Sequence, residues 1–573
     1  MKANRIAFLM LGGFLVILAN LINMQVIGGD YYRTLSEKNR IRVIYLEGPR
    51  GKILDRHGQL LASSRLSFNC SVSPREAKSR IRPSCEMLAG ILGVDSADLE
   101  KSYEKKKPGF FNTVLLAEDI KVSQAIAIEE KLDLLPGFFI ETSPQREYPL
   151  RGAAAHLVGY LGPMTESEID ALELYGYRQT DWLGREGIEK SYESYLRGQS
   201  GGLQIEVDNR GRLIRALGVK EPKEGKDLEL TIDAVLQSCV QRLLQDQKGA
   251  VLVMELKEGG ILSVNSSPSF DPNFFASVNG RKKVGKYLHD RSGPMVNRGI
   301  RGQFPPGSIF KMITALAALE NHKIFKETVF HCPGFMMIGG NRFRCWSDAG
   351  HGTQSLSEAF AHSCDVFFYN TGLLAGVDAI REKCLAFGLS KPTGIDLPSE
   401  KKGLVPSKRW KLLTHQRAWY EGDTANLAIG QGYLEITPIQ ALVMIGAMAT
   451  QGHLFRPHVV DKIDGMKITE GNATPVWIRP ENWNLVKNGL DQVVNSPTGT
   501  GRLARVPGLR IAGKTGSAES GQKKTHAWFV GFAPLEHPKI AVVVFLEQGG
   551  HGGISAARMA SSIFAWLKEA AYL

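Results

Sequence analysis

The chain has 573 residues, 43% of them hydrophobic and 22% charged, with a formal net charge of +12 at pH 7. These proportions are those of folded proteins and exclude extensive disorder, and the length predicts roughly three or four domains. The positive charge would fit a nucleic-acid binder, a protein close to a membrane, one working beside an anionic polymer, or simply a well-solvated surface. Because the lysines are scattered and no long basic arm occurs, we expect no nucleic-acid partner.

A membrane anchor is predicted at the start of the chain. Lys2 and Arg5 precede an uncharged stretch, residues 6–29, which as a helix would extend about 36 Å and could cross a membrane once. The positive charges predict that residues 1–5 lie in the cytoplasm and that the chain after the span lies outside it. A cleaved signal peptide is the competing interpretation, but no clear Ala-x-Ala cleavage site follows the long apolar run. This favours an uncleaved signal anchor.

Two regions are predicted after the anchor. Residues 30–221 alternate short strand patterns with glycine, proline and one helix-like stretch, which predicts an elongated α+β region. A charged stretch containing glycine and proline, residues 218–233, places a domain boundary near residue 222. Within residues 222–573, strand patterns occur at both ends and helix patterns between them. We therefore predict one α/β sheet domain flanked by helices, whose two ends meet.

Four Ser-x-x-Lys pairs occur in the chain, and one has the context of a nucleophile and its base. The pairs are Ser308 with Lys311, Ser102 with Lys105, Ser399 with Lys402, and Ser520 with Lys523. The sequence Pro-Pro-Gly before Ser308 interrupts regular secondary structure, and a helix pattern follows. Ser308 is therefore predicted at a helix N-terminus. Free amides and the helix dipole stabilise developing negative charge there. Lys311 follows one turn later on the same face.

A lysine can take the proton of a serine only if its pKa is depressed by burial or by another cation. A working site therefore needs a second cation near Lys311. Lys514, in the motif Lys-Thr-Gly-Ser at the start of a predicted strand, is the candidate. The other three pairs lie in charged or polar segments. None of their serines is predicted at the start of a helix that follows a segment such as Pro-Pro-Gly.

Three motifs then carry a resemblance to a known family. "SIFK" (308–311), "SCD" (363–365) and "KTGS" (514–517) have the order and approximate spacing of the three motifs of penicillin-binding proteins and serine β-lactamases. Upstream, "RGKILDRHGQLLA" (50–62) and "GREGIEKSYESYLRG" (184–198) resemble motifs in the pedestal domain of class B penicillin-binding proteins. Asp365 in the second motif and the cysteine-containing insertion before it resemble the elongation-type members, whereas the division-type enzyme, the alternative, usually has Asn at that position.

The resemblance implies a serine transpeptidase that needs no cofactor for catalysis. Ser308 would attack the penultimate D-alanine carbonyl of a peptidoglycan stem peptide and release terminal D-alanine, with Lys311 as the base. Ser363 would relay a proton to the leaving amine, Asp365 would hold the network of Ser363 and Lys311, and Lys514 would tune the local field. β-Lactams would acylate Ser308 and block it, and such a site would also support a carboxypeptidase side activity.

The third motif is implied to bind the substrate. The amides of Ser308 and Ser517 would form the oxyanion hole. The hydroxyls of Thr515 and Ser517, on either side of Gly516, would hold the substrate carboxylate. A penicillin-binding scaffold or sensor without turnover is the alternative from another class, but it would be expected to have lost Ser308, Lys311 or Lys514.

The resemblance also implies location and partners. The anchor would hold the protein in the inner, cytoplasmic membrane as a single-pass protein, with the catalytic domain in the periplasm. A RodA-type glycosyltransferase and other proteins of the elongation complex would be its partners, through the span and the pedestal.

A second cluster of reactive residues is a candidate metal site. The spacing C-x12-C-x5-H-x12-C joins Cys332, Cys345, His351 and Cys364, and three thiolates with one imidazole make a closed tetrahedral zinc set. A disulfide between two of these cysteines, or buried free thiols, are the alternatives. One ligand could instead come from a neighbouring side chain: His331, Asp348 or His362. We expect a structural zinc ion, placed behind the second motif because Cys364 lies between Ser363 and Asp365.

Overall fold

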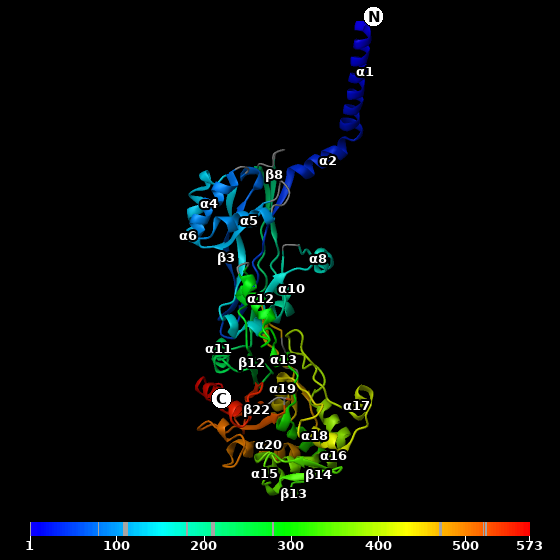
Figure 1. Ribbon diagram of the computed structural model, residues 1–573, viewed down its shortest axis with the longest axis vertical. Coiled ribbons are helices and arrows are strands. Elements are labelled where there is room, and N and C mark those ends of the chain that lie inside the picture. Colours follow the sequence, from blue (N-terminus) through cyan, green and yellow to red (C-terminus); the bar gives the residue numbers. More distant parts are fainter. Residues whose placement is uncertain are drawn as a thin grey trace. The chain divides into compact units, whose positions relative to one another are not determined.

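A computed structural model describes residues 2–77, 80–106, 113–178, 181–207, 213–277, 280–468, 473–519, 521 and 524–573 (Figure 1). The chain folds into two compact units, each assembled from three segments. The smaller unit comprises Met1–Gly51, Ser64–Gln145 and Arg197–Gly225, and the larger comprises Lys52–Ser63, Arg146–Leu196 and Lys226–Leu573. Two segments of the region 30–221, which was predicted as one domain, thus pack within the larger unit.

The N-terminal helix α1 (Lys2–Ile22) continues as a π-helical turn (Asn23–Ile27) and is followed by α2 (Gly29–Arg40). The stretch Ile6–Ile27 has a mean hydropathy of 2.2, and none of it is buried within the protein. Among the residues that the structure describes, this is the one helix long and apolar enough to cross a membrane. By length and composition, the predicted anchor is therefore a candidate membrane span.

The smaller unit contains a three-stranded antiparallel sheet and a separate α+β core. The sheet has the order β1–β8–β9, with bounds Ile41–Leu46, Gly201–Val207 and Leu213–Lys220. In the core, β3 pairs with β4 and β5, and three helices pack with these strands. The bounds are β3 (Leu60–Val72), β4 (Val114–Ile120), β5 (Phe138–Glu147), α4 (Ile81–Leu92), α5 (Ser96–Lys106) and α6 (Val122–Glu129), with β3 belonging to this unit from Ser64 onward and β5 up to Gln145. Cys70, Cys85 and Ile128 are fully buried here.

The larger unit is built on a five-stranded antiparallel sheet. Its order is β12–β11–β23–β22–β21, so two strands from the start of the domain lie beside three strands from its end. The bounds are β11 (Gly249–Glu255), β12 (Ile261–Ser267), β21 (Ala512–Ala518), β22 (His526–Ala533) and β23 (Ile540–Leu546). Strand β11 pairs with β23 along its whole length. The predicted α/β sheet domain with meeting ends is therefore confirmed.

Helices enclose this sheet and form most of the remaining core. All twelve residues of α19 (Pro438–Ala449) are buried, as expected for a helix that is apolar on every side. Helix α14 (Lys311–Glu320) is buried at nine of its ten residues and packs against α16 (Asp365–Ala386). The other helices of this region include α15 (Leu356–Ala361), α18 (Glu421–Ala428), α20 (Pro480–Asn495) and α21 (Ser555–Glu569). The first residue of α14, Lys311, is thereby carried into the protein interior.

A buried histidine makes the stability of the larger unit sensitive to acid. Burial lowers the pKa of His156 to about 4, and its ring packs edge-on against Phe270 with 5.2 Å between centroids. The unfolded chain binds a proton at this position below about pH 6.5, whereas the folded chain does so only near pH 4. Stability therefore falls as the pH drops through this window, by up to about 3 kcal/mol from this residue.

We expect His156→Phe to reduce this loss. Melting temperatures of the wild type and the variant, measured at pH 7 and pH 4.5, should fall further for the wild type. Equal falls in the two proteins would show that His156 is not the titrating group.

Candidate active site and cysteine cluster

Ser308 lies on a 3₁₀ turn, Gly307–Phe310, that leads directly into α14. Gly307 has a φ of +56°, and its amide donates to the carbonyl oxygen of Gly430 at 2.9 Å. A side chain on Gly307 would come within 2.8 Å of the carbonyl oxygen of Ser517, so the turn fits closely against β21. Ser308 is partly exposed at this junction, where a helix N-terminus meets an edge strand.

Two buried lysines meet at the hydroxyl of Ser363. Lys311 is fully buried, and its Nζ donates to Asp365 Oδ1 at 2.7 Å, to the Ser363 carbonyl oxygen at 2.8 Å and to Ser363 Oγ at 3.2 Å. Lys514 is also fully buried, and its Nζ lies 2.9 Å from Ser363 Oγ. Residues from three motifs far apart in the sequence are thus brought into one hydrogen-bonded cluster.

The electrostatics of this cluster distinguish the two lysines. Burial, together with the positive charge of Lys311, holds the pKa of Lys514 well below its ordinary value. Lys311 makes a direct ion pair with Asp365. An amine with a depressed pKa beside a serine hydroxyl can accept or pass a proton near neutral pH, which an ordinary surface lysine cannot.

Ser363 is held in an uncommon backbone conformation. Its φ is +54°, a left-handed conformation that non-glycine residues seldom adopt and that clusters at functional sites. Its amide donates to the carbonyl oxygen of Phe360 at 3.1 Å, at the end of α15. Helix α16 begins two residues later at Asp365. This tight turn directs the Ser363 hydroxyl between the two lysines.

The other Ser-x-x-Lys pairs do not form such a site. Ser102 and Lys105 lie within α5, and Lys105 is exposed. Ser399 lies in a loop, and Lys402 is exposed there. Ser520 and Lys523 lie outside the described residues. Burial of the lysine therefore separates Ser308 and Lys311 from the two other pairs that the structure describes.

The third motif lies on β21, next to the turn of Ser308. A side chain on Gly516 would come within 2.9 Å of the carbonyl oxygen of Pro306. Thr515 is almost fully buried and its hydroxyl donates to Thr500 Oγ1 at 3.0 Å. Ser517 is exposed, and its hydroxyl accepts a hydrogen bond from the amide of Gly552 at 3.2 Å. Both hydroxyls of the motif thus have a fixed partner outside the strand.

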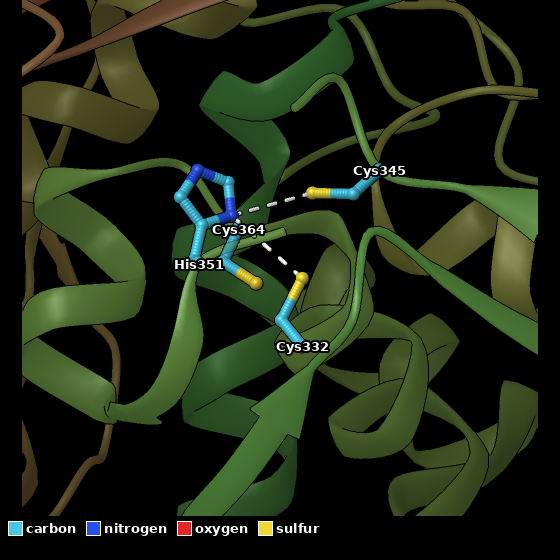
Figure 2. Close-up of side chains that lie close together, drawn as sticks. All are labelled: Cys332, Cys345, His351 and Cys364. Carbon is cyan, nitrogen blue, oxygen red and sulfur yellow. Dashed lines mark hydrogen bonds between the residues drawn. The ribbon is translucent and has the colours of Figure 1, made fainter. Parts of the chain in front are cut away.

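The four predicted metal ligands lie together (Figure 2). The Nδ1 atom of His351 is 3.5 Å from Cys345 Sγ and 3.7 Å from Cys332 Sγ, and all four ligand atoms lie within 4.8 Å of one another. Zn–S bonds of about 2.3 Å and a Zn–N bond of about 2.0 Å give tetrahedral S–N edges of about 3.5 Å. Cys332, Cys345 and Cys364 are buried. The donor set and its spacing therefore fit a zinc ion.

The contacts of His362 and the state of the cysteines bear on the two alternatives, another ligand or a disulfide. His362 stacks on His351 with an interplanar angle of 2°, and its two nitrogens contact Gln354 and Thr498. All seven cysteines lie in the described part of the chain, and none of them is in a disulfide there. A hydrogen bond with the Cys364 thiol is the main cause that lowers the pKa of Cys345, which favours the thiolate form that metals bind.

The cysteine cluster is linked to Asp365 through two backbone amides. The amide of Trp346, the residue after Cys345, donates to Asp365 Oδ2 at 3.0 Å. The amide of Asp365 points back to Cys345 Sγ at 3.4 Å. The cluster therefore fixes the carboxylate that pairs with Lys311, as the position of Cys364 within the second motif suggested.

Several residues of the site were not predicted from the sequence. Gly430, Trp346, Thr500 and Gly552 reach it from separate loops, and each contributes through a backbone group or a single hydroxyl. The Thr- and Gly-rich segment 497–501 is the one local pattern that could have attracted attention, but nothing in it indicates which strand it would meet.

Comparisons with known proteins agree with this geometry. A family model described as the penicillin binding protein transpeptidase domain matches residues 249–565, and one described as the penicillin-binding protein dimerisation domain matches residues 45–230. Peptidoglycan D,D-transpeptidase MrdA of Haemophilus influenzae is 32% identical over 96% of this chain and 88% of its own length. The protein of the same name from Acinetobacter baumannii is 33% identical over 96% of this chain and 85% of its own length.

A solved structure shows the same fold. Penicillin-binding protein 2 of Helicobacter pylori, in its complex with MreC, matches with a TM-score of 0.83 and 28% sequence identity, over 93% of this chain and 99% of its own. The sequence-based assignment, fold and enzyme class are therefore confirmed. The chain belongs to the penicillin-binding proteins, with a dimerisation domain before its transpeptidase domain, and within them to the MrdA-type peptidoglycan D,D-transpeptidases.

Proposed function

We propose that the chain crosslinks peptidoglycan stem peptides during cell-wall elongation through an acyl-enzyme on Ser308. The observation that carries this proposal is the buried cluster in which Lys311 and Lys514 both reach Ser363 Oγ, at 3.2 and 2.9 Å, beside the turn of Ser308. Such a cluster is costly to bury unless its charges are used or paired. It supplies both a base for the nucleophile and a route for the proton.

In the first half-reaction Ser308 Oγ forms a bond to the carbonyl carbon of the penultimate D-alanine. The bond from this carbon to the terminal D-alanine nitrogen breaks. Lys311, in its neutral form, accepts the serine proton and delivers it to Ser363 Oγ, which contacts Lys311 Nζ and passes its own proton to the leaving amine. In the second half-reaction an amine of a neighbouring stem attacks the ester carbonyl, forms the crosslink and returns the proton to Ser308.

The same proposal assigns the remaining groups. Asp365 keeps Lys311 in position through the 2.7 Å ion pair, and Lys514 sets the local field. The amides of Ser308 and Ser517 stabilise the oxyanion. The hydroxyls of Thr515 and Ser517, with the close approach that Gly516 permits, hold the terminal carboxylate of the acyl donor.

We further propose that Cys332, Cys345, His351 and Cys364 hold a structural zinc ion. When bound, the ion would connect the segment that carries Cys332, Cys345 and His351 to Cys364, the residue before α16. The support is the four-atom geometry and the two hydrogen bonds that link Cys345 and Trp346 to Asp365. The ion would have a structural role, and the proposed catalytic steps use side chains and backbone amides of the chain.

For location and partners we propose the arrangement that the family resemblance implies. Residues 1–5 are cytoplasmic, 6–29 span the inner membrane, 30–221 form the pedestal and 222–573 the periplasmic transpeptidase domain. The MreC complex of the Helicobacter pylori protein supports a place in an elongation complex. A RodA-type glycosyltransferase is the expected polymerase partner.

Adduct mapping tests the proposed chemistry. The full chain in detergent is incubated with benzylpenicillin, and intact mass followed by peptide mapping locates the adduct. We expect one adduct per chain, on the peptide that contains Ser308. An adduct on another serine would contradict the assignment, and a folded chain that forms none would favour the scaffold alternative.

A further inference from the structure

A polar cavity of about 280 Å³ lies in the larger unit, and none of the residues of the three motifs lines it. Four short strands lie side by side here in the order β19–β18–β10–β2. The cavity is lined from β10, β18 and β19, from the turn after β2 and from the turn between β11 and β12. The bounds are β2 (Ile53–Leu54), β10 (Leu228–Leu230), β18 (Val460–Ile463) and β19 (Met466–Lys467). Segments far apart in the sequence thus build one cavity.

A buried histidine with an unpartnered ring nitrogen lines this cavity. His458 is 6% exposed, and its Nδ1 atom has no hydrogen-bond partner among the residues that the structure describes. The backbone holds the residue, because its amide donates to the carbonyl oxygen of Gly259 at 3.3 Å and its carbonyl oxygen accepts from the amide of Ile261 at 2.9 Å. A buried nitrogen without a partner costs free energy, and a ligand that supplies a hydrogen bond would remove this cost.

Part of the charge around the cavity is compensated within the protein. Lys462 and Lys467 lie opposite each other on β18 and β19, where two like charges repel. Lys462 Nζ lies 2.6 Å from Glu229 Oε2, and Lys467 Nζ lies 2.6 Å from Glu258 Oε2. These four side chains together therefore carry no net charge.

Four other charged side chains around the cavity keep hydrogen-bonding capacity for a ligand. The guanidinium group of Arg56 lies 3.6 Å from Glu255 Oε2, which is beyond hydrogen-bond distance. Lys257 and Asp461 also line the cavity, and neither makes an ion pair with another described residue. Two cations and two carboxylates again balance, so a ligand with one charge of each sign suits this lining better than a ligand with a net charge.

We propose that this cavity binds a short peptide with a free amino end and a free carboxyl end. Its carboxylate contacts Lys257 and the ring of His458, and its ammonium group contacts Asp461. At about 30 Å³ per water molecule, the cavity has the space of about nine waters, which suits a dipeptide. The inference goes beyond the proposed function and does not rest on it, because the motifs of the proposed active site do not line this cavity.

The test is a titration of the full chain in detergent with D-alanyl-D-alanine, its N-acetyl derivative and its C-terminal amide. The two derivatives remove the positive and the negative charge in turn. Benzylpenicillin is first allowed to acylate Ser308, so that the proposed active site is filled. Saturation-transfer NMR on the methyl signals of each ligand gives its dissociation constant. We expect the dipeptide to bind at least about 10-fold more tightly than either derivative, because each derivative loses a charge-assisted contact.

Variants assign each end of the ligand to its residue. We expect Asp461→Asn to weaken binding of the dipeptide about 10-fold and to leave the N-acetyl derivative unchanged. Lys257→Ala should weaken the dipeptide and the N-acetyl derivative but leave the amide unchanged. His458→Phe should weaken the dipeptide by a factor similar to that of Asp461→Asn. His453→Phe, at an exposed histidine outside the cavity, is the control and should bind all three ligands like wild type.

Equal affinity for the three ligands, no binding of the dipeptide, or the same losses in His453→Phe would overturn the inference. If His458→Phe melts early, the variants of Asp461 and Lys257 still decide, because both side chains are at least partly exposed. A wild type that forms no benzylpenicillin adduct would overturn the proposed function alone, since the same titration can then be made on the untreated chain.

Discussion

Replacing Ser308 by alanine is expected to abolish covalent labelling by a fluorescent penicillin. The alanine variants of Ser102, Ser399 and Ser520 are expected to label like wild type. The reason is geometric, because Lys311 is fully buried beside Ser363 and Lys514, whereas Lys105 and Lys402 are exposed. Loss of a nucleophile from such a site typically lowers the rate by more than about 10³-fold.

The measurement is gel fluorescence of the full chain in detergent, with the melting temperature of each variant as the control for folding. Lys311→Ala is a useful companion, because it removes the base but leaves Ser308. It should also lose labelling, and it should melt earlier, since Asp365 would be left without its ion-pair partner at a cost of about 3–5 kcal/mol. Labelling that persists in Ser308→Ala would disprove the catalytic assignment.

Loss of one cysteine ligand is expected to remove zinc, lower the melting temperature and slow acylation. Cys332→Ser is the most informative variant, because Cys332 is distant in sequence from Asp365. Changing Cys364 would alter the residue next to Asp365, and changing Cys345 would remove the acceptor of the Asp365 amide. If the variant weakens zinc binding about 100-fold, it loses about 2.7 kcal/mol of linked stability. For a domain of roughly 350 residues, whose entropy of unfolding is about 0.7 kcal/mol/K, that corresponds to about 3–4 °C.

Zinc content by elemental mass spectrometry, thermal melting and the acylation rate are measured together. Cys239→Ser, at a partly buried cysteine outside the cluster, serves as the matched control and should keep the metal. Wild type should contain one zinc ion per chain. Two results would favour the disulfide alternative instead. The wild type would contain no zinc although zinc was present during purification, or two cysteines of the cluster would resist alkylation until they are reduced.

The two buried lysines illustrate how far the sequence alone could lead. The need for a second cation near Lys311 followed from the chemistry of a serine nucleophile, and Lys514 was identified because its motif follows in the right order. The sequence could not show that both ammonium groups meet at Ser363 Oγ. That meeting requires a left-handed backbone at Ser363, which no residue pattern predicts for a serine.

The division of the chain was less accessible to sequence reasoning. Composition places a boundary near residue 222, but the segments Lys52–Ser63 and Arg146–Leu196 pack within the larger unit. Such assignments depend on which apolar faces meet in space. A linear change of composition reports only where the chain becomes more polar or less regular.

By itself the sequence determined the candidate N-terminal span, the sheet whose end strands meet, the proposed nucleophile with its two lysines and the four candidate zinc ligands, because each depends on residue type at short or ordered spacing. Only the tertiary structure decided that Gly430 fixes the turn of Ser308, that Trp346 joins the cysteine cluster to Asp365 and that Thr500 supports Thr515. These contacts use backbone groups or common hydroxyls from distant loops. Residue type carries no information about them until folding has brought the loops together.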